Sequence, residues 1–367
     1  MKLIVDATAV REHGGGVSTY ATALLNAWTA TFRDDHLVVV AGDPGGARVM
    51  RAVTADVRVS PFGGSRFITR HALIPVLTRK ERPDAIFALV PGVPLVPSKV
   101  PIVSVVYDMR SWIHPDEFPI WVRAYRRLGH HHAFHRSTRL ITISERSRLD
   151  LAAVCRQGGK KAHVIHPAAD HVDDWPRHPR EPNVITFGHW SNKKPGMAIR
   201  AWATALRLAD SPPRWKLHVV GVPQGASDEL VEAAGELGVA GSVQVHGYLP
   251  DAAYQRLFTS ASAVLMLSSF EGYGLPVVEA MRQGIHVIAS RDAALLEAGG
   301  PSAVYVEGEA DLSKALYDVL ENKTDVQRMV QSGLLRTRDM TWASTATDAR
   351  AVIQRAIARG EEALPEP

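Results

Sequence analysis

The sequence has almost no cysteine and no long uncharged hydrophobic run. Its single cysteine, Cys155, cannot form an internal disulfide, and one thiol alone cannot build a metal site. The apolar N-terminal stretch is interrupted by Asp6 and then by Arg11, which argues against both a signal peptide and a membrane-spanning helix. We therefore expect a cytoplasmic protein that works in reducing surroundings.

A strong excess of one charge is also absent. The 42 Lys and Arg residues stand against 38 Asp and Glu, and the formal net charge of +4 does not call for nucleic acid as a partner. The mild positive balance suits anionic ligands, either the phosphates of a small molecule or the head groups of a membrane. A length of 367 residues with 46% hydrophobic content predicts two domains.

Short β-branched runs alternate with amphipathic stretches along the chain, which is the pattern of parallel α/β sheets. We predict an α/β fold of two doubly wound domains, residues 1–170 and 184–340, facing each other across a cleft that holds the ligands. A proline-rich segment without periodicity, 171–183, is the expected linker. A last helical pattern at about 341–360 follows no new strand and is expected to pack back onto the first domain.

The densest group of candidate site residues follows the apolar run AVLMLSS and reads FEGYGLPVVEAM. Gly272 and Gly274 allow a ligand to approach the backbone, and Pro276 suits the first turn of a helix. The free amides and the dipole of that helix end would bind a diphosphate. Glu271 and Glu279 can flank one ligand and accept hydrogen bonds from sugar hydroxyls. Taken alone, the two glutamates could equally be a surface residue and a residue that complements the helix dipole.

This segment resembles the E-x7-E signature of glycosyltransferase family 4, whose members have two Rossmann-like domains, the GT-B architecture, and typically read EGFGLP-x-x-EAM. The similarity continues through GIHVIAS at 284–290, where the family has G-x-PVIAS. The resemblance implies that Glu271 lies at the transferred sugar and that Glu279 holds the ribose of the nucleotide. The donor-binding residues that it implies beside Glu279 are Gly272, Tyr273, Gly274 and Leu275.

A second segment of the same domain, VITFGHWSNKKPG, resembles the family stretch in which a glycine ends the first strand and a basic pair follows. The resemblance makes Gly188 and His189 candidate donor ligands, although many members carry Arg in place of His189. Lys193 and Lys194 are the basic pair, and lysines there would neutralise the leaving diphosphate, a catalytic role. As isolated residues they would be ordinary solvated lysines.

The first domain contributes two weaker segments. A lone glycine run usually marks only a turn, but here it resembles the family's GG-[IV] loop, which implies that the amides of Gly15 and Gly16 reach the donor phosphate. Tyr107 and Asp108 align with a pair that often reads His-Asp, so we expect Tyr107 to donate and Asp108 to accept a hydrogen bond in catalysis. His114 is a further candidate, although an ordinary loop residue is the more common interpretation.

Basic side chains elsewhere in this domain allow several interpretations. His131 and His135 have the one-turn spacing of metal ligands, but no acidic or cysteine partner is evident, and a partly solvated basic helix is favoured. The same helix could rest on an anionic membrane, from which related enzymes reach lipid-linked acceptors. Its other candidate contacts are Trp121, Arg123, Arg126 and Arg127. Arg146 and Arg148 are assigned to acceptor binding or to surface charge.

The resemblance implies a retaining glycosyltransferase that moves a hexose-type sugar from a UDP- or GDP-linked donor to a glycan, lipid-linked or small-molecule hydroxyl. No side chain is a convincing covalent nucleophile, so we expect same-face substitution. No DxD-like metal motif lies near the donor segment, and we expect neither metal nor cofactor beyond the nucleotide sugar. A nucleotide-sugar epimerase, a phosphorylase of the same architecture and a catalytically silent nucleotide-sugar-binding protein remain alternatives.

Overall fold

The protein is described by a computed structural model that covers residues 1–12, 14–54, 56–189, 191–209 and 214–362. The chain divides into two compact units. The first consists of Met1–Pro167 and the C-terminal segment from Trp342, and the second consists of Ala168–Thr341. Within the described ranges, no helix is long and apolar enough to cross a membrane.

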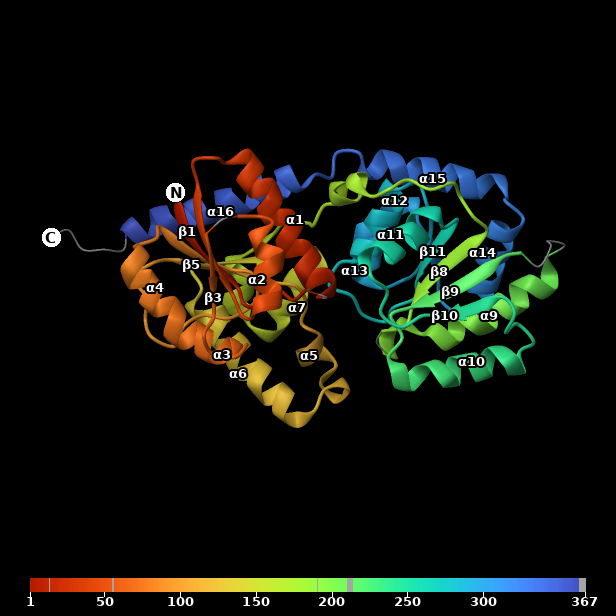
Figure 1. The fold of residues 1–367 in the computed structure, drawn as a ribbon, viewed down its shortest axis with the longest axis horizontal. Helices are drawn as coiled ribbons and strands as arrows, with labels where there is room; N and C mark the ends of the chain where they lie inside the picture. The colour runs from red at the N-terminus through yellow and green to blue at the C-terminus, as the bar shows by residue number, and fades with distance from the viewer. Residues whose placement is uncertain (13, 55, 190, 210–213, 363–367) are drawn as a thin grey trace. The chain divides into compact units, whose positions relative to one another are not determined.

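The first unit is built on a seven-stranded sheet in which all neighbouring strands run parallel (Figure 1). The central strands are almost wholly apolar and buried, as a sheet with helices on both faces requires. In spatial order the strands are β3 (Val57–Val59), β2 (His36–Ala41), β1 (Lys2–Ala7), β4 (Ala85–Ala88), β5 (Ile102–Val106), β6 (Arg139–Thr142) and β7 (Ala162–Val164).

Helices connect these strands, and the label η marks short 3-10 helices and, at η1, one π-helical turn. In chain order the helices are α1 (Gly15–Thr31), α2 (Pro44–Arg51), α3 (Arg66–Ile68), η1 (Thr69–Leu73), α4 (Ile74–Glu81), α5 (Arg110–Ile113), η2 (Pro115–Glu117), α6 (Ile120–Arg136), α7 (Glu145–Val154), α8 (Arg156–Lys161) and the C-terminal α16 (Trp342–Glu362).

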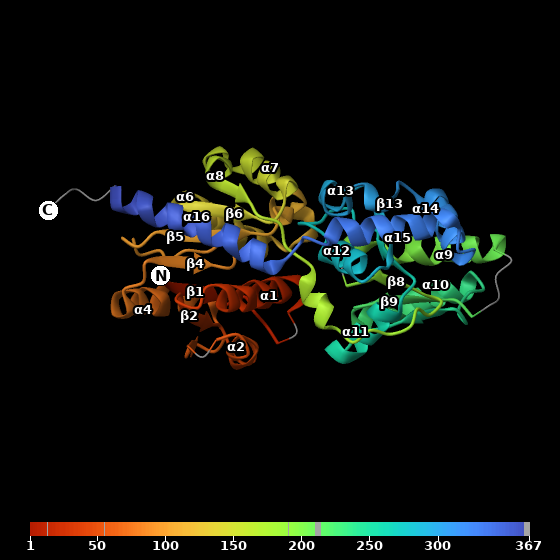
Figure 2. The same ribbon diagram turned by 90° about the horizontal axis from the view of Figure 1, so that it is seen from above.

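The C-terminal helix α16 packs on the first unit although it is last in the chain. In Figure 2 this blue helix runs alongside red α1 and strands β4 to β6. Its buried residues recur at helical spacing and form one apolar face: Ala346, Ala349, Val352, Ile353 and Ala356. Arg350 Nε donates to Asp35 at 2.8 Å, and Thr345 Oγ1 donates to the carbonyl oxygen of His166 at 3.0 Å.

The second unit has a six-stranded parallel sheet of the same topology. Its strands in spatial order are β10 (Val243–Val245), β9 (Lys216–Val220), β8 (Asn183–Phe187), β11 (Ala263–Met266), β12 (His286–Ser290) and β13 (Val304–Val306). Its helices are η3 (Asp170–Asp174), η4 (Ser191–Lys193), α9 (Pro195–Leu208), η5 (Gln224–Ala226), α10 (Ser227–Glu236), α11 (Asp251–Ser260), α12 (Leu275–Arg282), α13 (Ala293–Gly299), η6 (Gly300–Ser302), α14 (Glu309–Leu320) and α15 (Thr324–Thr337).

The expected linker, 171–183, lies inside the second unit and differs from a free connection. It contains most of η3, whose Asp173 accepts a hydrogen bond from Arg282 Nε at 2.9 Å, and the side chain of Gln283 donates to the carbonyl oxygen of Val172. The prolines that suggested a linker therefore belong to an irregular segment held against α12 by polar contacts.

Candidate functional site

The strand order of the second sheet brings its two predicted site segments together. Strands β8 and β11 are parallel neighbours at the point where the order of the sheet reverses, so the loops at their carboxyl ends are adjacent. One loop leads into η4 and α9, and the other leads into α12. Residues almost 80 positions apart in the sequence therefore meet at this edge of the sheet.

An ion pair joins the two loops. Lys193 Nζ lies 2.5 Å from Glu271 Oε1, and these side chains are only 8% and 17% exposed. Asn192, which the sequence did not suggest, adds two hydrogen bonds. Its Nδ2 donates to the carbonyl oxygen of Phe270 at 2.9 Å, and its own carbonyl oxygen accepts from the amide of Ser269 at 3.0 Å. The loop that carries Glu271 is therefore held in place from the β8 side.

The two lysines of the predicted basic pair have different surroundings. Lys193 is buried against Glu271, with its ammonium 5.9 Å from the centre of the Phe187 ring. Lys194 is exposed and has a left-handed backbone, φ 51°, at the N-cap of α9. The structure therefore brings Lys193 to Glu271 and directs Lys194 toward solvent.

The start of α12 requires a glycine. Gly274 is the N-cap and has φ 108°, and a Cβ there would lie 2.6 Å from Leu295 Cδ2. Leu275 and Pro276 occupy the first helical positions, where proline loses no hydrogen bond. Pro276 has no amide hydrogen, and the amide of Val277 donates to the carbonyl oxygen of Gly274 at 2.9 Å. The first turn therefore offers a ligand the amide of Leu275 and the positive end of the helix dipole. Next to it, burial raises the pKa of the Tyr273 hydroxyl.

Glu279 lies in the second turn of α12 and is 6% exposed. Its Oε1 is 3.1 Å from His171 Nε2 in η3, a partner that sequence reasoning missed. Burial, and then the negative charge of Glu279, raise the pKa of Tyr254 well above its usual range. The carboxylate of Glu279 is thus surrounded by groups of the second unit that fix its position.

Gly188 and His189 follow β8 directly. A Cβ at Gly188 would lie 2.6 Å from Val222 Cγ2, and the amide of Gly188 donates to the carbonyl oxygen of Val220 at 2.9 Å. The glycine is therefore required by packing against the end of β9. His189 is exposed, beside Gly221.

In the first unit, the glycine run leads into α1, which begins at Gly15. Gly15 has φ 56°, and a Cβ at Gly14 would collide with the Ser18 hydroxyl, which accepts from the amide of Arg11 at 3.0 Å. Gly15 and Gly16 are exposed. Gly15 is thus favoured by its positive φ, and Gly14 by the lack of room for a Cβ. The amides at the start of the helix are accessible.

Tyr107 and Asp108 come directly after β5. The Tyr107 ring meets Tyr20 of α1 edge-on at 5.3 Å, and its buried hydroxyl has no hydrogen-bond partner among the described residues. Burial raises the pKa of this hydroxyl well above its usual range. Asp108 Oδ1 accepts from the amide of Arg110 at 2.9 Å, a contact that shapes the turn before α5, and His114 follows the end of that helix.

The basic residues of the first unit find mainly local partners. Arg146 Nε donates to Asp150 at 2.6 Å, and Arg148 pairs with Glu145 of the same helix. His131 and His135 meet through their Nε2 atoms at 3.1 Å. Within the ranges that the structure describes, no group of three or more His, Cys, Asp or Glu residues is arranged to hold a metal ion.

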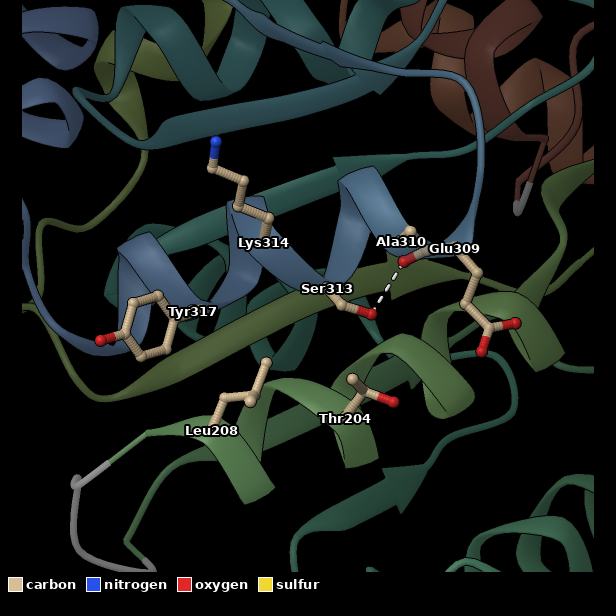
Figure 3. Close-up of a pocket in the computed structure, with 7 residues that line it drawn as sticks. All are labelled: Thr204, Leu208, Glu309, Ala310, Ser313, Lys314 and Tyr317. Carbon is tan, nitrogen blue, oxygen red and sulfur yellow. Dashed lines mark hydrogen bonds between the residues drawn. The ribbon is translucent and has the colours of Figure 1, made fainter.

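A hollow of about 560 Å³ lies elsewhere in the second unit, between α9 and α14 (Figure 3). Ser313 Oγ donates to the carbonyl oxygen of Glu309 at 2.8 Å on one wall. Its lining residues are Thr204, Leu208, Glu309, Ala310, Ser313, Lys314 and Tyr317. None of the predicted site residues lines it, so the ion-paired loops after β8 and β11 remain the candidate site.

A family model described as "Family 4 Glycosyltransferase in conflict systems" matches residues 98–348, about two thirds of the chain. The chain belongs to this family. The resemblance inferred from EGYGLPVVEAM is thereby confirmed, and the matched region includes every candidate residue of the second unit.

Two curated relatives of this family 4 glycosyltransferase cover only part of it. One is the MMP alpha-(1->4)-mannosyltransferase of Mycolicibacterium hassiacum, 28% identical over 227 residues, or 60% of this chain and 54% of the relative. Another is the D-inositol 3-phosphate glycosyltransferase of Nocardia farcinica, 30% identical over 177 residues, or 46% of this chain and 39% of the relative. The matches thus span about half or less of these relatives.

The fold is shared over the full length with solved structures. The crystal structure of Anabaena Alr3699/HepE in complex with UDP and glucose matches with a TM-score of 0.71 and 18% identity, covering 97% of this chain and 100% of that one. Two Rossmann-like units, the GT-B architecture predicted for the family 4 chain, are therefore confirmed.

Proposed function

We propose that this family 4 glycosyltransferase transfers a hexose-type sugar from a nucleotide-sugar donor to an acceptor hydroxyl with retention of the anomeric configuration. The observation that carries the proposal is the buried Lys193–Glu271 ion pair, three residues before the N-cap of α12. A carboxylate, an ammonium and the positive end of the α12 dipole lie together there, and these groups suit a sugar and a diphosphate.

Each group has a role in this proposal. The amide of Leu275 and the positive end of the α12 dipole bind the diphosphate, and Glu279 accepts hydrogen bonds from the ribose hydroxyls. Glu271 accepts a hydrogen bond from the transferred sugar and keeps Lys193 in place. Lys193 and Lys194 neutralise the charge that develops as the diphosphate leaves.

The proposed reaction proceeds on one face of the sugar. The bond between the anomeric carbon and the diphosphate oxygen breaks through an oxocarbenium-like state, and the acceptor oxygen forms the new bond on the same face. The leaving phosphate oxygen takes the acceptor's proton, and no covalent intermediate forms, since the sequence offers no convincing side-chain nucleophile. The positive charge of the lysines and the positive end of the α12 dipole stabilise the negative charge that develops on the leaving diphosphate. A metal ion has this role in other transferases, so the proposed reaction requires no metal.

The partners are proposed from relatives and from charge. The Alr3699/HepE structure is named as a complex with UDP and glucose, and the Mycolicibacterium relative is named a mannosyltransferase. UDP- and GDP-hexoses are therefore the first donors to test. The proposed acceptor is a hydroxyl of a glycan, a lipid-linked sugar or a small molecule. We further propose that the enzyme works in the cytoplasm at the surface of a membrane.

Donor binding and turnover test the proposal. Thermal unfolding of the wild type is followed with UDP, GDP, ADP, dTDP and their hexose conjugates, and one nucleotide is expected to stabilise it by mass action. Glu279→Ala should lose this response, whereas Glu309→Gln, at the start of α14 with its side chain 42% exposed, should keep it. With the donor known, NMR of the product should show a retained anomeric configuration.

Other outcomes would replace the proposal. If no nucleotide stabilises the wild type, the donor site is wrong. A product epimerised at a ring carbon without an acceptor indicates an epimerase, and a sugar phosphate formed only with added phosphate indicates a phosphorylase. Tight nucleotide binding without any turnover over a panel of acceptors indicates a silent binding protein.

A further inference from the structure

Large apolar side chains are exposed together on one surface of the first unit. They come from α3, from the loop at 94–96 and from α6, and Figure 1 labels the two helices. The most exposed are Ile120, Leu128 and Trp121, at 76%, 75% and 72%. We call this the α6 surface, and its apolar members are Phe67, Ile68, Leu95, Val96, Ile120, Trp121, Tyr125 and Leu128.

Contacts between the three segments make the surface continuous. The Phe67 ring lies 4.2 Å from that of His71, and His71 Nδ1 accepts from the amide of Leu95 at 3.1 Å. His132 of α6 is hydrogen-bonded through Nε2 to the carbonyl oxygen of Pro94 at 3.3 Å. The exposed apolar side chains are therefore fixed beside one another by the fold.

The apolar row on α6 follows from helical geometry. Trp121, Tyr125 and Leu128 are spaced four and three positions apart and share one face, while Ala133 and Phe134 of the same helix are buried in the unit. A helix that already buries one apolar side against its sheet thus presents a second apolar row to the outside. Packing within the unit does not require that second row.

Positive charge surrounds the apolar row. Arg66 is exposed in α3, and the guanidinium of Arg126 on α6 lies 4.8 Å from the centre of the Phe118 ring. Desolvation, and then the positive charges of Arg11, Arg70 and Arg126, lower the pKa of Arg66. Arg11 pairs with Asp43 and Arg70 with Asp6, whereas among the described residues Arg66 and Arg126 form no ion pair.

Acidic residues are scarce around the same elements. No Asp or Glu occurs in 57–80, 85–107 or 118–144. The nearest ones on the approach to α6 are engaged: Asp116 pairs with Arg123 at 3.4 Å, and Glu117 pairs with Arg110. The α6 surface is thus apolar and cationic at once.

From this combination we infer that the α6 surface docks on an anionic lipid bilayer. Trp121 and Tyr125 are amphipathic rings suited to the head-group level, and the aliphatic side chains beside them enter the acyl boundary. Arg66 and Arg126 contact lipid phosphates. This inference rests on the proposal that the enzyme works at a membrane surface. It adds which residues contact the membrane and that the lipids are anionic.

Other occupants fit the surface less well. A second copy bound by two-fold symmetry would place arginines against arginines without carboxylates to pair them. Nucleic acid would leave five aliphatic side chains without a stacking partner, because bases stack on rings and guanidinium planes.

Vesicle binding by the full chain tests the inference. Vesicles of phosphatidylcholine alone and with about one third phosphatidylglycerol are sedimented with the protein at low and high salt. The wild type is expected to bind only the anionic vesicles, and less at high salt. Trp121→Asp combined with Leu128→Asp should weaken binding at least tenfold, and Arg66→Gln combined with Arg126→Gln should remove its salt dependence.

The matched control is Leu208→Asp combined with Leu335→Asp, which changes side chains 62% and 71% exposed in the second unit and should bind as the wild type does. Equal binding to neutral vesicles, no binding by the wild type, or unchanged binding by the α6 variants would overturn the inference. Self-association of the wild type, abolished by the α6 variants, would assign the surface to a second copy. Nucleotide stabilisation of the same variants is measured in parallel, so failure of docking is distinguishable from failure of the donor site.

Discussion

His171 and Glu279 tie η3 to α12, with His171 Nε2 3.1 Å from Glu279 Oε1 and the two side chains only 16% and 7% exposed. The glutamate expected to hold the ribose is therefore oriented before any ligand binds. A preoriented carboxylate loses less side-chain entropy when the ligand arrives, and this favours binding.

Replacing His171 with alanine should lower stability and weaken nucleotide binding, because a buried carboxylate would lose its partner. The expected cost is about 1–3 kcal/mol of the free energy of unfolding, and the thermal shift with the preferred nucleotide should shrink. Denaturant unfolding and ligand-dependent melting measure the two effects.

His178→Ala is the matched control, since His178 is in the same segment but is hydrogen-bonded through Nδ1 to Thr259 Oγ1 at 2.9 Å. It should cost stability and leave the nucleotide response intact. Equal loss of the response in both variants would mean that His171 acts only through the stability of the segment.

Lys193→Ala should reduce turnover by about 10²–10³, the usual cost of removing one preorganised electrostatic group. It should cost more than Lys194→Ala, because Lys193 alone of the pair is buried against Glu271. Steady-state rates with the identified donor test this. Lys314→Ala, in the hollow of Figure 3, should have the wild-type rate. If Lys194→Ala lost more turnover than Lys193→Ala, Lys194 would be the lysine that mainly stabilises the leaving diphosphate.

Some of this site could be predicted because its signals are local. A buried strand, two glycines and an early proline together predict that a helix starts at Gly274. This prediction needs no information about the rest of the fold. The contact between Lys193 and Glu271 depends in addition on β8 and β11 being neighbours. That follows from the doubly wound strand order, which the alternating pattern does predict.

Other features depend on contacts that no local pattern encodes. His171 reaches Glu279 across 108 positions from a segment without periodicity. The Tyr107 hydroxyl is enclosed beside Tyr20 of α1, which also meets Trp342 of α16 edge-on at 5.3 Å. The strands Val57–Val59 and Val304–Val306 are three residues long, too short to show an alternating pattern.

Gly274→Ala should destabilise the second unit, because the residue has φ 108° and a Cβ would lie 2.6 Å from Leu295 Cδ2. The backbone strain costs about 1–3 kcal/mol, and the displaced leucine adds to it. Gly235→Ala is the opposite control: it lies in α10 with open space around it and should stabilise by about 0.5–1 kcal/mol. Denaturant unfolding of both variants measures the difference. Equal stability of the two would show that the loop before α12 relaxes at no cost.

Acid should destabilise the second unit through His286, whose buried ring is 2% exposed and whose pKa burial lowers from 6.5 to about 4. Since the unfolded chain takes up this proton below pH 6.5 and the folded chain does not until about pH 4, stability falls as the pH drops through that window and levels off below it. The loss reaches about 3 kcal/mol for this one residue. Unfolding free energies at pH 7.5, 5.5 and 4.5 should therefore decline less steeply in His286→Gln than in the wild type. An unchanged slope in His286→Gln would show that other groups carry the acid sensitivity.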